Sequence, residues 1–175
     1  MLRKSPAREA TRTGRAAPDP SFCFAGADRL VALGFRHWML GYQTGEIACW
    51  EAAWREFSGV LGPAPARAAV GDLSCWVRTI ARLARRPIKV YPDGCRRFCR
   101  DECMAVSMVA ASQHEVCPAM RACAFALIEH SDVEEVVAES AVLAERLKRL
   151  GQVLSTASIA NAAALSLSAP STAHH

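Results

Sequence analysis

Apolar residues recur at helical spacing along most of this chain, and this periodicity constrains its fold more than any other feature. In the segment 66–85 the apolar positions lie three or four residues apart, which places them on one side of a helix. They are Val70, Leu73, Val77, Ile80 and Ala84. The segment 136–154 carries a similar, heptad-like stripe. Only residues 88–91 favour an extended conformation, and they are too few and too isolated to build a sheet.

Composition agrees with a helical fold. The chain has 175 residues, about half of them hydrophobic and 7% aromatic, and alanine, leucine, arginine and glutamate dominate. The sequence therefore predicts an all-α protein, a compact bundle of about six helices in a single domain over 23–154. We expect a disordered basic leader over 1–22 and a flexible Ala/Ser/Thr tail over 155–175.

Two features bear on the compartment. The basic start of the chain is not followed by the apolar region of a signal peptide, so we expect a cytoplasmic protein whose thiols stay reduced. The most apolar stretch, 30–42, is interrupted by Arg36 and His37. A membrane span is therefore not expected.

An aromatic stripe marks the second predicted helix. Trp50, Trp54, Phe57 and Leu61 follow one another at helical spacing and so share one face. The simplest interpretation is a core face, with a ligand-stacking platform as the alternative.

The stretch 92–103 is the most unusual in the chain, because it carries three thiols at four-residue spacing. Asp93 is a good N-cap, so we expect a helix over 94–112 with Cys95, Cys99 and Cys103 on one side. Glu102 lies on the same side, and we expect it to pair with an arginine. Adjacent thiolates at this spacing can ligate one soft ion.

The expected surroundings of these thiols favour the thiolate. Cys95 would lie in the first helical turn next to Arg96 and Arg97, and such a setting lowers a thiol pKa. Cys117 is a candidate N-cap for the next helix, and His114 precedes it by three residues. The candidate metal ligands are thus Cys95, Cys99, Cys103, Cys117 and His114. Zn, Cu(I) or an iron–sulfur cluster would suit thiolate ligands.

Two other interpretations of the cysteines stay open at this point. They can be packing residues, because free cysteine behaves as a small hydrophobe, or they can form a disulfide. The spacing matches neither a zinc-finger nor a ferredoxin pattern. Cys95 with Cys99 is the expected reactive pair, and Cys103 and Cys123 are expected to belong to the core.

Charge is unevenly distributed, although the net charge of the chain is only +4. The stretch 78–100 holds eight basic residues and a single acidic one, whereas all the charged residues of 129–145 are acidic. We expect the two stretches either to face each other or to be solvated separately, with an anionic partner as the functional alternative. The candidate partner-binding residues are Arg78, Arg82, Arg85, Arg86, Arg96, Arg97 and Arg100.

These features lead to two main functional hypotheses. The first is a non-enzymatic, bacterial-type accessory or regulatory protein that binds a soft metal or senses redox state through its cysteines. The second is a helical interaction module whose basic surface docks an acidic protein or nucleic acid, with the cysteines serving only as packing. A cysteine-nucleophile enzyme is the third hypothesis. No phosphate-binding loop or hydrolase motif is present in the sequence.

Overall fold

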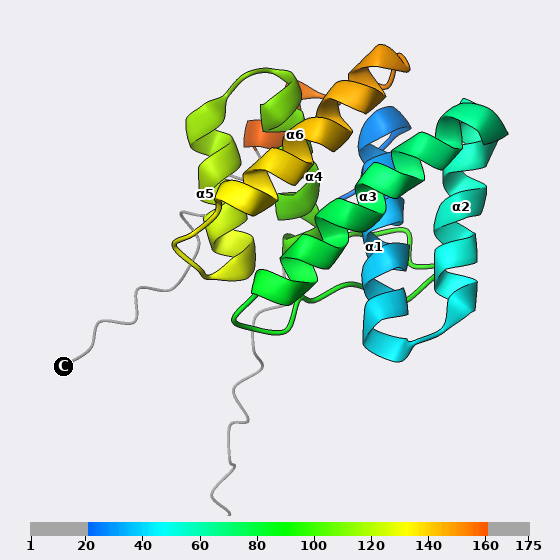
Figure 1. The fold of residues 1–175 in the computed structure, drawn as a ribbon, viewed down its shortest axis with the longest axis horizontal. Helices are drawn as coiled ribbons and strands as arrows, with labels where there is room; N and C mark the ends of the chain where they lie inside the picture. Colours follow the sequence, from blue (N-terminus) through cyan, green and yellow to red (C-terminus); the bar gives the residue numbers. More distant parts are fainter. Residues whose placement is uncertain (1–20, 161–175) are drawn as a thin grey trace, which may run out of the picture.

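Six α-helices and one short helical turn make up the part of the chain that the structure, a computed structural model, describes, residues 21–160 (Figure 1). The helices are α1 (Gly26–Thr44), α2 (Ile47–Leu61), α3 (Pro63–Leu83), α4 (Arg100–Gln113), α5 (Cys117–Ile128) and α6 (Glu134–Arg149). No strand forms within this range; its one β-type pairing is an isolated bridge between Phe22 and Phe98. The prediction of an all-α bundle is confirmed.

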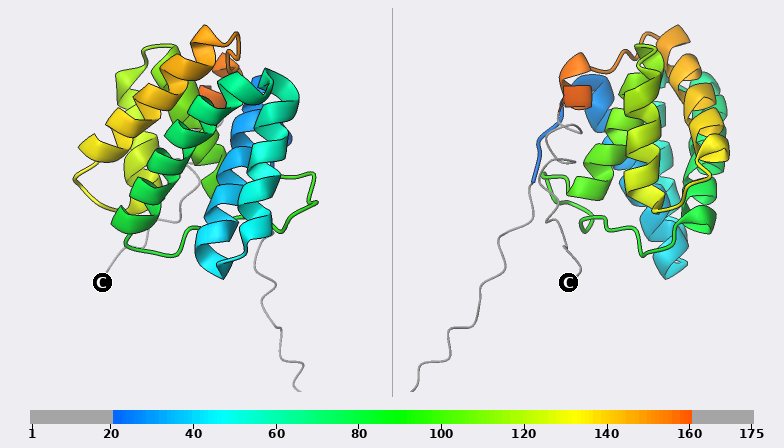
Figure 2. Two further views of the ribbon diagram at one scale, coloured as in Figure 1. Left: turned by 45° about the vertical axis from the view of Figure 1, so that its right-hand side comes forward. Right: turned by 90° about the vertical axis from the view of Figure 1, so that its left-hand side faces the viewer.

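The helices pack around α4, which is buried on nearly every side. It contacts α1, α5 and α6, while α3 lies between α2 and α6 in front of it (Figures 1 and 2). The long α3–α4 loop, residues 84–99, runs along the lower side of the bundle in Figure 1. This loop therefore connects the first three helices, α1–α3, to the last three, α4–α6.

Aromatic and aliphatic side chains from α1, α2 and α3 fill the core between these helices. Phe57 is fully buried, as the periodicity of its helix predicts, and Trp76 of α3, which lay outside the predicted stripe, is fully buried as well. Trp54, in contrast, is 37% exposed, so the aromatic stripe of α2 only partly faces the core. The core is close-packed at Gly34, where an added Cβ would lie 2.6 Å from a ring carbon of Phe57.

Several helix ends differ from the expected ones. α3 begins at Pro63, because proline suits the first turn of a helix and Gly62 turns the chain with φ 81. α6 ends at Arg149 instead of continuing to residue 154, because Gly151 adopts the left-handed region at φ 75.

The segment after α6 packs against the bundle. Residues 156–160 form the short helical turn, and Asp28 of α1 accepts hydrogen bonds from the Ser155 amide and the Ser158 hydroxyl. Residues 155–160, expected to belong to the tail, are thus attached to α1. Residues 1–20 and 161–175, which make up most of the predicted leader and tail, lie outside the described residues.

None of the helices within residues 21–160 combines the length and the apolar character needed to cross a bilayer.

The packing at Gly34 generates a stability prediction. Gly34→Ala should lower the free energy of unfolding by about 1–3 kcal/mol, because the new methyl group overpacks the contact with Phe57. Gly71→Ala is the matched control, since a Cβ there meets nothing within 4 Å and should stabilise the α3 helix by about 0.5–1 kcal/mol. Urea unfolding of both variants measures the difference. Equal effects of the two substitutions would contradict the close packing of α1 on α2.

Candidate functional site

Arg36 is wholly buried in the middle of α1 and ties the α3–α4 loop to the start of α4. Its Nε donates to Oε1 of Glu102 at 2.6 Å, and one Nη donates to Oε2 at 3.2 Å. The guanidinium also donates to the backbone carbonyls of Cys95 and Arg97, each at 2.6 Å. The expectation that Glu102 pairs with an arginine is confirmed, and its partner comes from a distant helix.

These contacts explain why α4 starts at Arg100 and not at residue 94. Gly94 lies in the left-handed region at φ 78, which interrupts a helix. The backbone amide of Phe98 donates to the carbonyl of Phe22, and the amide of Phe22 donates to the carbonyl of Phe98, each with an N···O distance of 2.9 Å. The two loop carbonyls that bind Arg36 are further acceptors that a helix would have used. The predicted helix over 94–112 is therefore wrong over residues 94–99.

Cys99, and not Asp93, is the N-cap of α4. Cys99 and Glu102 form a capping box, in which the carboxylate accepts the Cys99 amide hydrogen at 2.6 Å. The Cys99 thiol also donates to the carbonyl of Lys89 at 3.1 Å. Because Cys95 precedes the helix, the three cysteines do not form the single helical face that the spacing predicted.

Burial, and not the neighbouring arginines, dominates the chemistry of the cysteines at the start of α4. Cys99 is 5% exposed, and desolvation together with the charge of Glu102 raises the pKa of its thiol to about 12. Burial likewise raises the pKa of Cys103, which is fully enclosed in the core. The expectation of a lowered pKa is wrong for Cys99. Cys123, expected in the core, is buried, and its thiol pKa is raised to about 11. All eight cysteines are free thiols, Cys95 being half-buried.

The remaining candidate ligands lie apart from this helix start. Cys117 is the exposed first residue of α5, whose N-cap is Val116. His114 is the C-cap of α4, and its Nε2 lies 2.8 Å from the carbonyl oxygen of Leu154. Within residues 21–160 no three or more His, Cys, Asp or Glu side chains form a group that could hold a metal ion. Metal binding by the five candidates stays a prediction.

The basic and acidic stretches meet at two ion pairs. Arg82 of α3 pairs with Glu135 of α6, and Arg86 of the loop pairs with Glu129 at 3.0 Å. Of the two arrangements expected, the one in which the stretches face each other is thus observed at these two pairs. Arg86 is also bound to a second carboxylate, that of Asp101, through two hydrogen bonds of 2.6 and 2.8 Å.

The other six cations of this stretch have no carboxylate within ion-pair distance in the described part of the chain. They are Arg78, Arg85, Lys89, Arg96, Arg97 and Arg100. Arg78 lies on α3, where its guanidinium contacts the sulfur of Cys75, and the other five belong to the loop or to the first residue of α4. The loop thus carries a concentration of unpaired positive charge, which we call the cationic loop surface and define as Arg85, Lys89, Arg96, Arg97 and Arg100.

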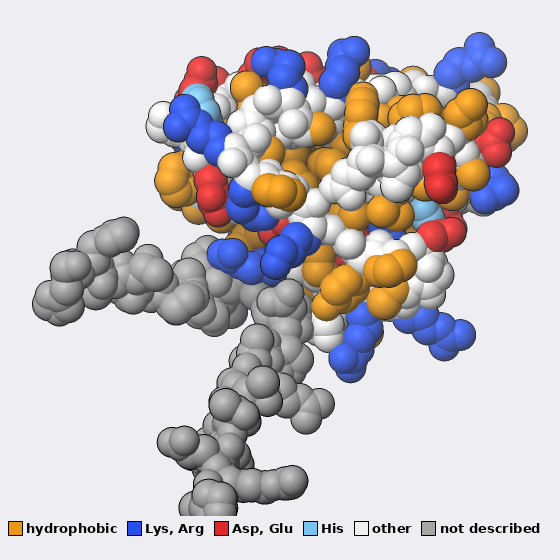
Figure 3. Space-filling model, turned by 90° about the horizontal axis from the view of Figure 1, so that it is seen from below, with side chains coloured by type: hydrophobic (Ala, Val, Ile, Leu, Met, Phe, Trp, Pro, Cys, Tyr) orange, Lys and Arg blue, Asp and Glu red, His pale blue; other side chains and the backbone are white. Residues whose placement is uncertain are grey.

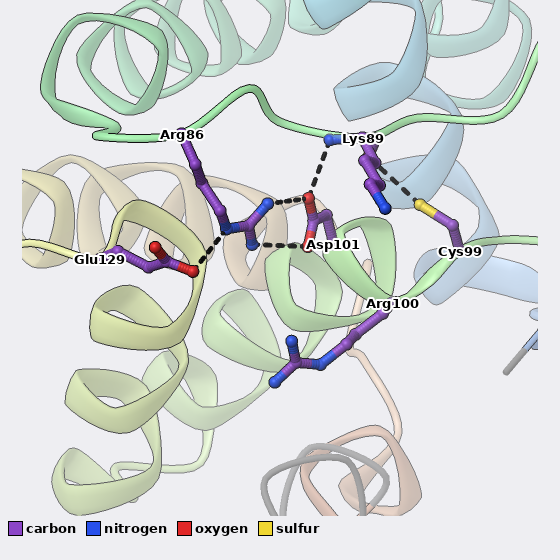
Figure 4. Close-up of a pocket in the computed structure, with 6 residues that line it drawn as sticks. All are labelled: Arg86, Lys89, Cys99, Arg100, Asp101 and Glu129. Atoms are coloured by element: carbon purple, nitrogen blue, oxygen red, sulfur yellow. Dashed lines mark hydrogen bonds and ion pairs between the residues drawn. The ribbon is translucent and has the colours of Figure 1, made fainter. Parts of the chain in front are cut away.

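A cleft of about 250 Å³ opens beside the loop, between the start of α4 and the end of α5 (Figure 4). Its lining residues are Arg86, Lys89, Cys99, Arg100, Asp101 and Glu129. In Figure 4, Arg86 is joined to both carboxylates, while the charged ends of Lys89 and Arg100 have no partner among the residues drawn. The cleft therefore offers two unpaired cations and one paired arginine to an anionic group.

Sequence reasoning missed several residues that build this region. It did not single out Arg36, Lys89, Asp101 or Glu129 as site residues. The signal for the helix start was present, because Cys99 and Glu102 have the spacing of a capping box, but cysteine is not a usual cap. The partners of Arg36 and Asp101 are long-range, and no local pattern indicates them.

Comparisons with protein-family models, with curated proteins and with solved structures find no match for this chain.

The thiol environments generate a prediction about reactivity. Iodoacetamide at about pH 8 should alkylate the exposed Cys23 and Cys117 first and leave Cys99 and Cys103 largely unmodified. A pKa raised from 9.0 to about 12 lowers the thiolate fraction of Cys99 roughly a thousandfold, and burial blocks access as well. Peptide mass spectrometry over time measures each rate. Alkylation of Cys99 as fast as that of Cys117 would contradict the buried capping arrangement.

Proposed function

We propose that this protein is a helical interaction module that docks an acidic segment of a partner protein on its cationic loop surface. The observation that carries the proposal is the set of five loop and helix-start cations without a carboxylate partner among residues 21–160. Isolated surface charges are common, but five within one segment create a local positive potential that attracts an anionic partner.

The loop that carries these cations is held in place before any partner binds. Arg36 fixes two of its carbonyls, Asp101 accepts the amide hydrogen of Lys89 at 2.8 Å, and Gln43 donates to the carbonyl of Ile88 at 2.7 Å. A preorganised surface loses little conformational entropy on binding. This arrangement supports a docking role for the loop.

The charges around the loop favour a protein partner over nucleic acid. Asp93 lies on the loop, and Asp101 and Glu129 line its cleft, so the surface has mixed sign. A nucleic acid presents uniform negative charge and would meet these carboxylates, whereas a protein segment can place acids only opposite the cations. Viewed from the side on which the loop lies in Figure 1, hydrophobic side chains lie between Lys and Arg side chains (Figure 3).

An apolar recess adjoins the charged cleft at Arg86, which lines both. This recess has a volume of about 400 Å³. Its other lining residues are Met39, Tyr42, Gln43, Ala81, Ala84, Pro87 and Ile88. A partner segment that combines acidic and apolar side chains would fill both hollows, whereas a phosphate backbone would use only the cations.

The metal or redox hypothesis has less support from the geometry. Cys99 has capping and packing contacts, and Cys103 is enclosed in the core. Zn, Cu(I) and iron–sulfur ligation stay predictions that metal analysis of the purified protein tests. A cytoplasmic setting remains our expectation, on the sequence ground that no apolar signal-peptide region follows the basic start.

The proposal predicts how binding responds to charge removal. A short fluorescein-labelled polyglutamate peptide should bind the protein, with an affinity that falls as salt rises. The triple variant Arg96→Gln, Arg97→Gln, Arg100→Gln should weaken binding by about tenfold, because it removes three of the five cations. Fluorescence anisotropy measures both effects.

The matched control removes the same charge elsewhere. Arg29→Gln, Arg55→Gln, Arg67→Gln changes three exposed arginines that lie outside the loop, and its affinity should stay within about threefold of the parent. Equal losses of affinity in both triple variants would show that binding depends on net charge and not on the loop, which would overturn the proposal. If the protein bound a labelled oligothymidylate but not the peptide, the partner class would be nucleic acid and not an acidic protein.

A further inference from the structure

The guanidinium of Arg86 forms ion pairs with two carboxylates that differ in burial. Its two Nη atoms donate to Asp101, whose side chain is 5% exposed, while Nε lies 3.0 Å from Oε1 of Glu129, whose side chain is 57% exposed. The ion pair with Asp101 is bidentate and shielded from water. The ion pair with Glu129 is monodentate, and it faces solvent at the mouth of the cleft.

The two pairs differ in how readily they exchange. Asp101 also accepts the backbone amide of Lys89, so releasing it would leave buried polar groups without partners. Among residues 21–160, Glu129 forms an ion pair with Arg86 alone, and exposed pairs contribute little to stability. Glu129 is therefore the carboxylate that another anion can replace.

The backbone places Glu129 at the edge of this cleft. It is the C-cap of α5 and adopts the left-handed region at φ 52, a position that favours glycine or asparagine. The amide of Arg85 donates to the carbonyl of Ile128 at 2.9 Å, which holds the end of α5 against the loop. Glu129 thus presents its carboxylate to Arg86 from a fixed helix end.

We propose that Glu129 is an internal competitor that occupies the position of a partner carboxylate. This inference rests on the proposed docking function. On binding, an aspartate or glutamate of the partner displaces the Glu129 carboxylate from Nε of Arg86. The ammonium of Lys89 and the guanidinium of Arg100, both unpaired and lining the same cleft, then supply the additional attraction that favours the exchange.

The size of the cleft fits one side chain of a larger partner. Its volume of about 250 Å³ lies below the range of roughly 300–1,000 Å³ typical of small-molecule sites. A carboxylate-bearing side chain enters such a space, while the rest of the partner lies across the cationic loop surface.

Glu129→Gln tests the inference directly. The amide keeps the shape of the side chain but removes its charge, so labelled polyglutamate should bind about threefold to fivefold more tightly to the variant. Glu145→Gln is the matched control, because Glu145 is an exposed α6 carboxylate paired with Arg149. It makes the same change in net charge and should alter the affinity by less than about twofold.

The two proposals fail in distinguishable ways. If the triple arginine variant loses binding but Glu129→Gln binds no more tightly than Glu145→Gln, docking stands and the competitor role is overturned. If neither the parent nor Glu129→Gln binds the peptide, the docking function itself is overturned. Tighter binding by Glu129→Gln that disappears when Arg100→Gln is added supports both.

Discussion

The buried ion pair between Arg36 and Glu102 is the interaction on which the rest of this architecture depends. Both side chains have no exposed surface, and their charges would be very costly there without partners. Arg36 donates to both oxygens of Glu102 and to two loop carbonyls, while the amide of Cys99 donates to Glu102. The guanidinium also lies 4.4 Å from the ring centre of Phe98. A buried pair with this many partners fixes one arrangement of the chain.

That arrangement decides where the cations of the loop lie. With their carbonyls held by Arg36, Cys95 and Arg97 lie at set positions along α1, and the Arg96 and Arg97 side chains are exposed. Asp101, next to Glu102 in sequence, does the same for Lys89 and Arg86. Two adjacent acids at the start of α4 thus organise opposite ends of one loop. The proposed docking surface is a consequence of this core.

Helical periodicity predicted much of the fold, because an apolar stripe is a local pattern. Val70, Leu73, Val77 and Ile80 of the predicted stripe are buried in α3, whereas Ala84, its fifth member, is the half-buried C-cap of the helix. The site was less predictable, because its determinants are contacts between distant segments. A helix starting at residue 94 suits the local sequence, yet Phe22 and Arg36 take backbone groups that such a helix needs. Treating Cys95, Cys99 and Cys103 as one face failed for that reason.

A double-mutant cycle on Arg36 and Glu102 tests the central claim most directly. The free energy of unfolding is measured for Arg36→Met, for Glu102→Gln and for the double variant. Each single change should cost about 3–5 kcal/mol, because it leaves the other charge buried and unpaired. The double variant should cost less than the sum, with a coupling energy of at least roughly 2 kcal/mol. Additive costs within about 0.5 kcal/mol would contradict the account, because the two charges would then act independently.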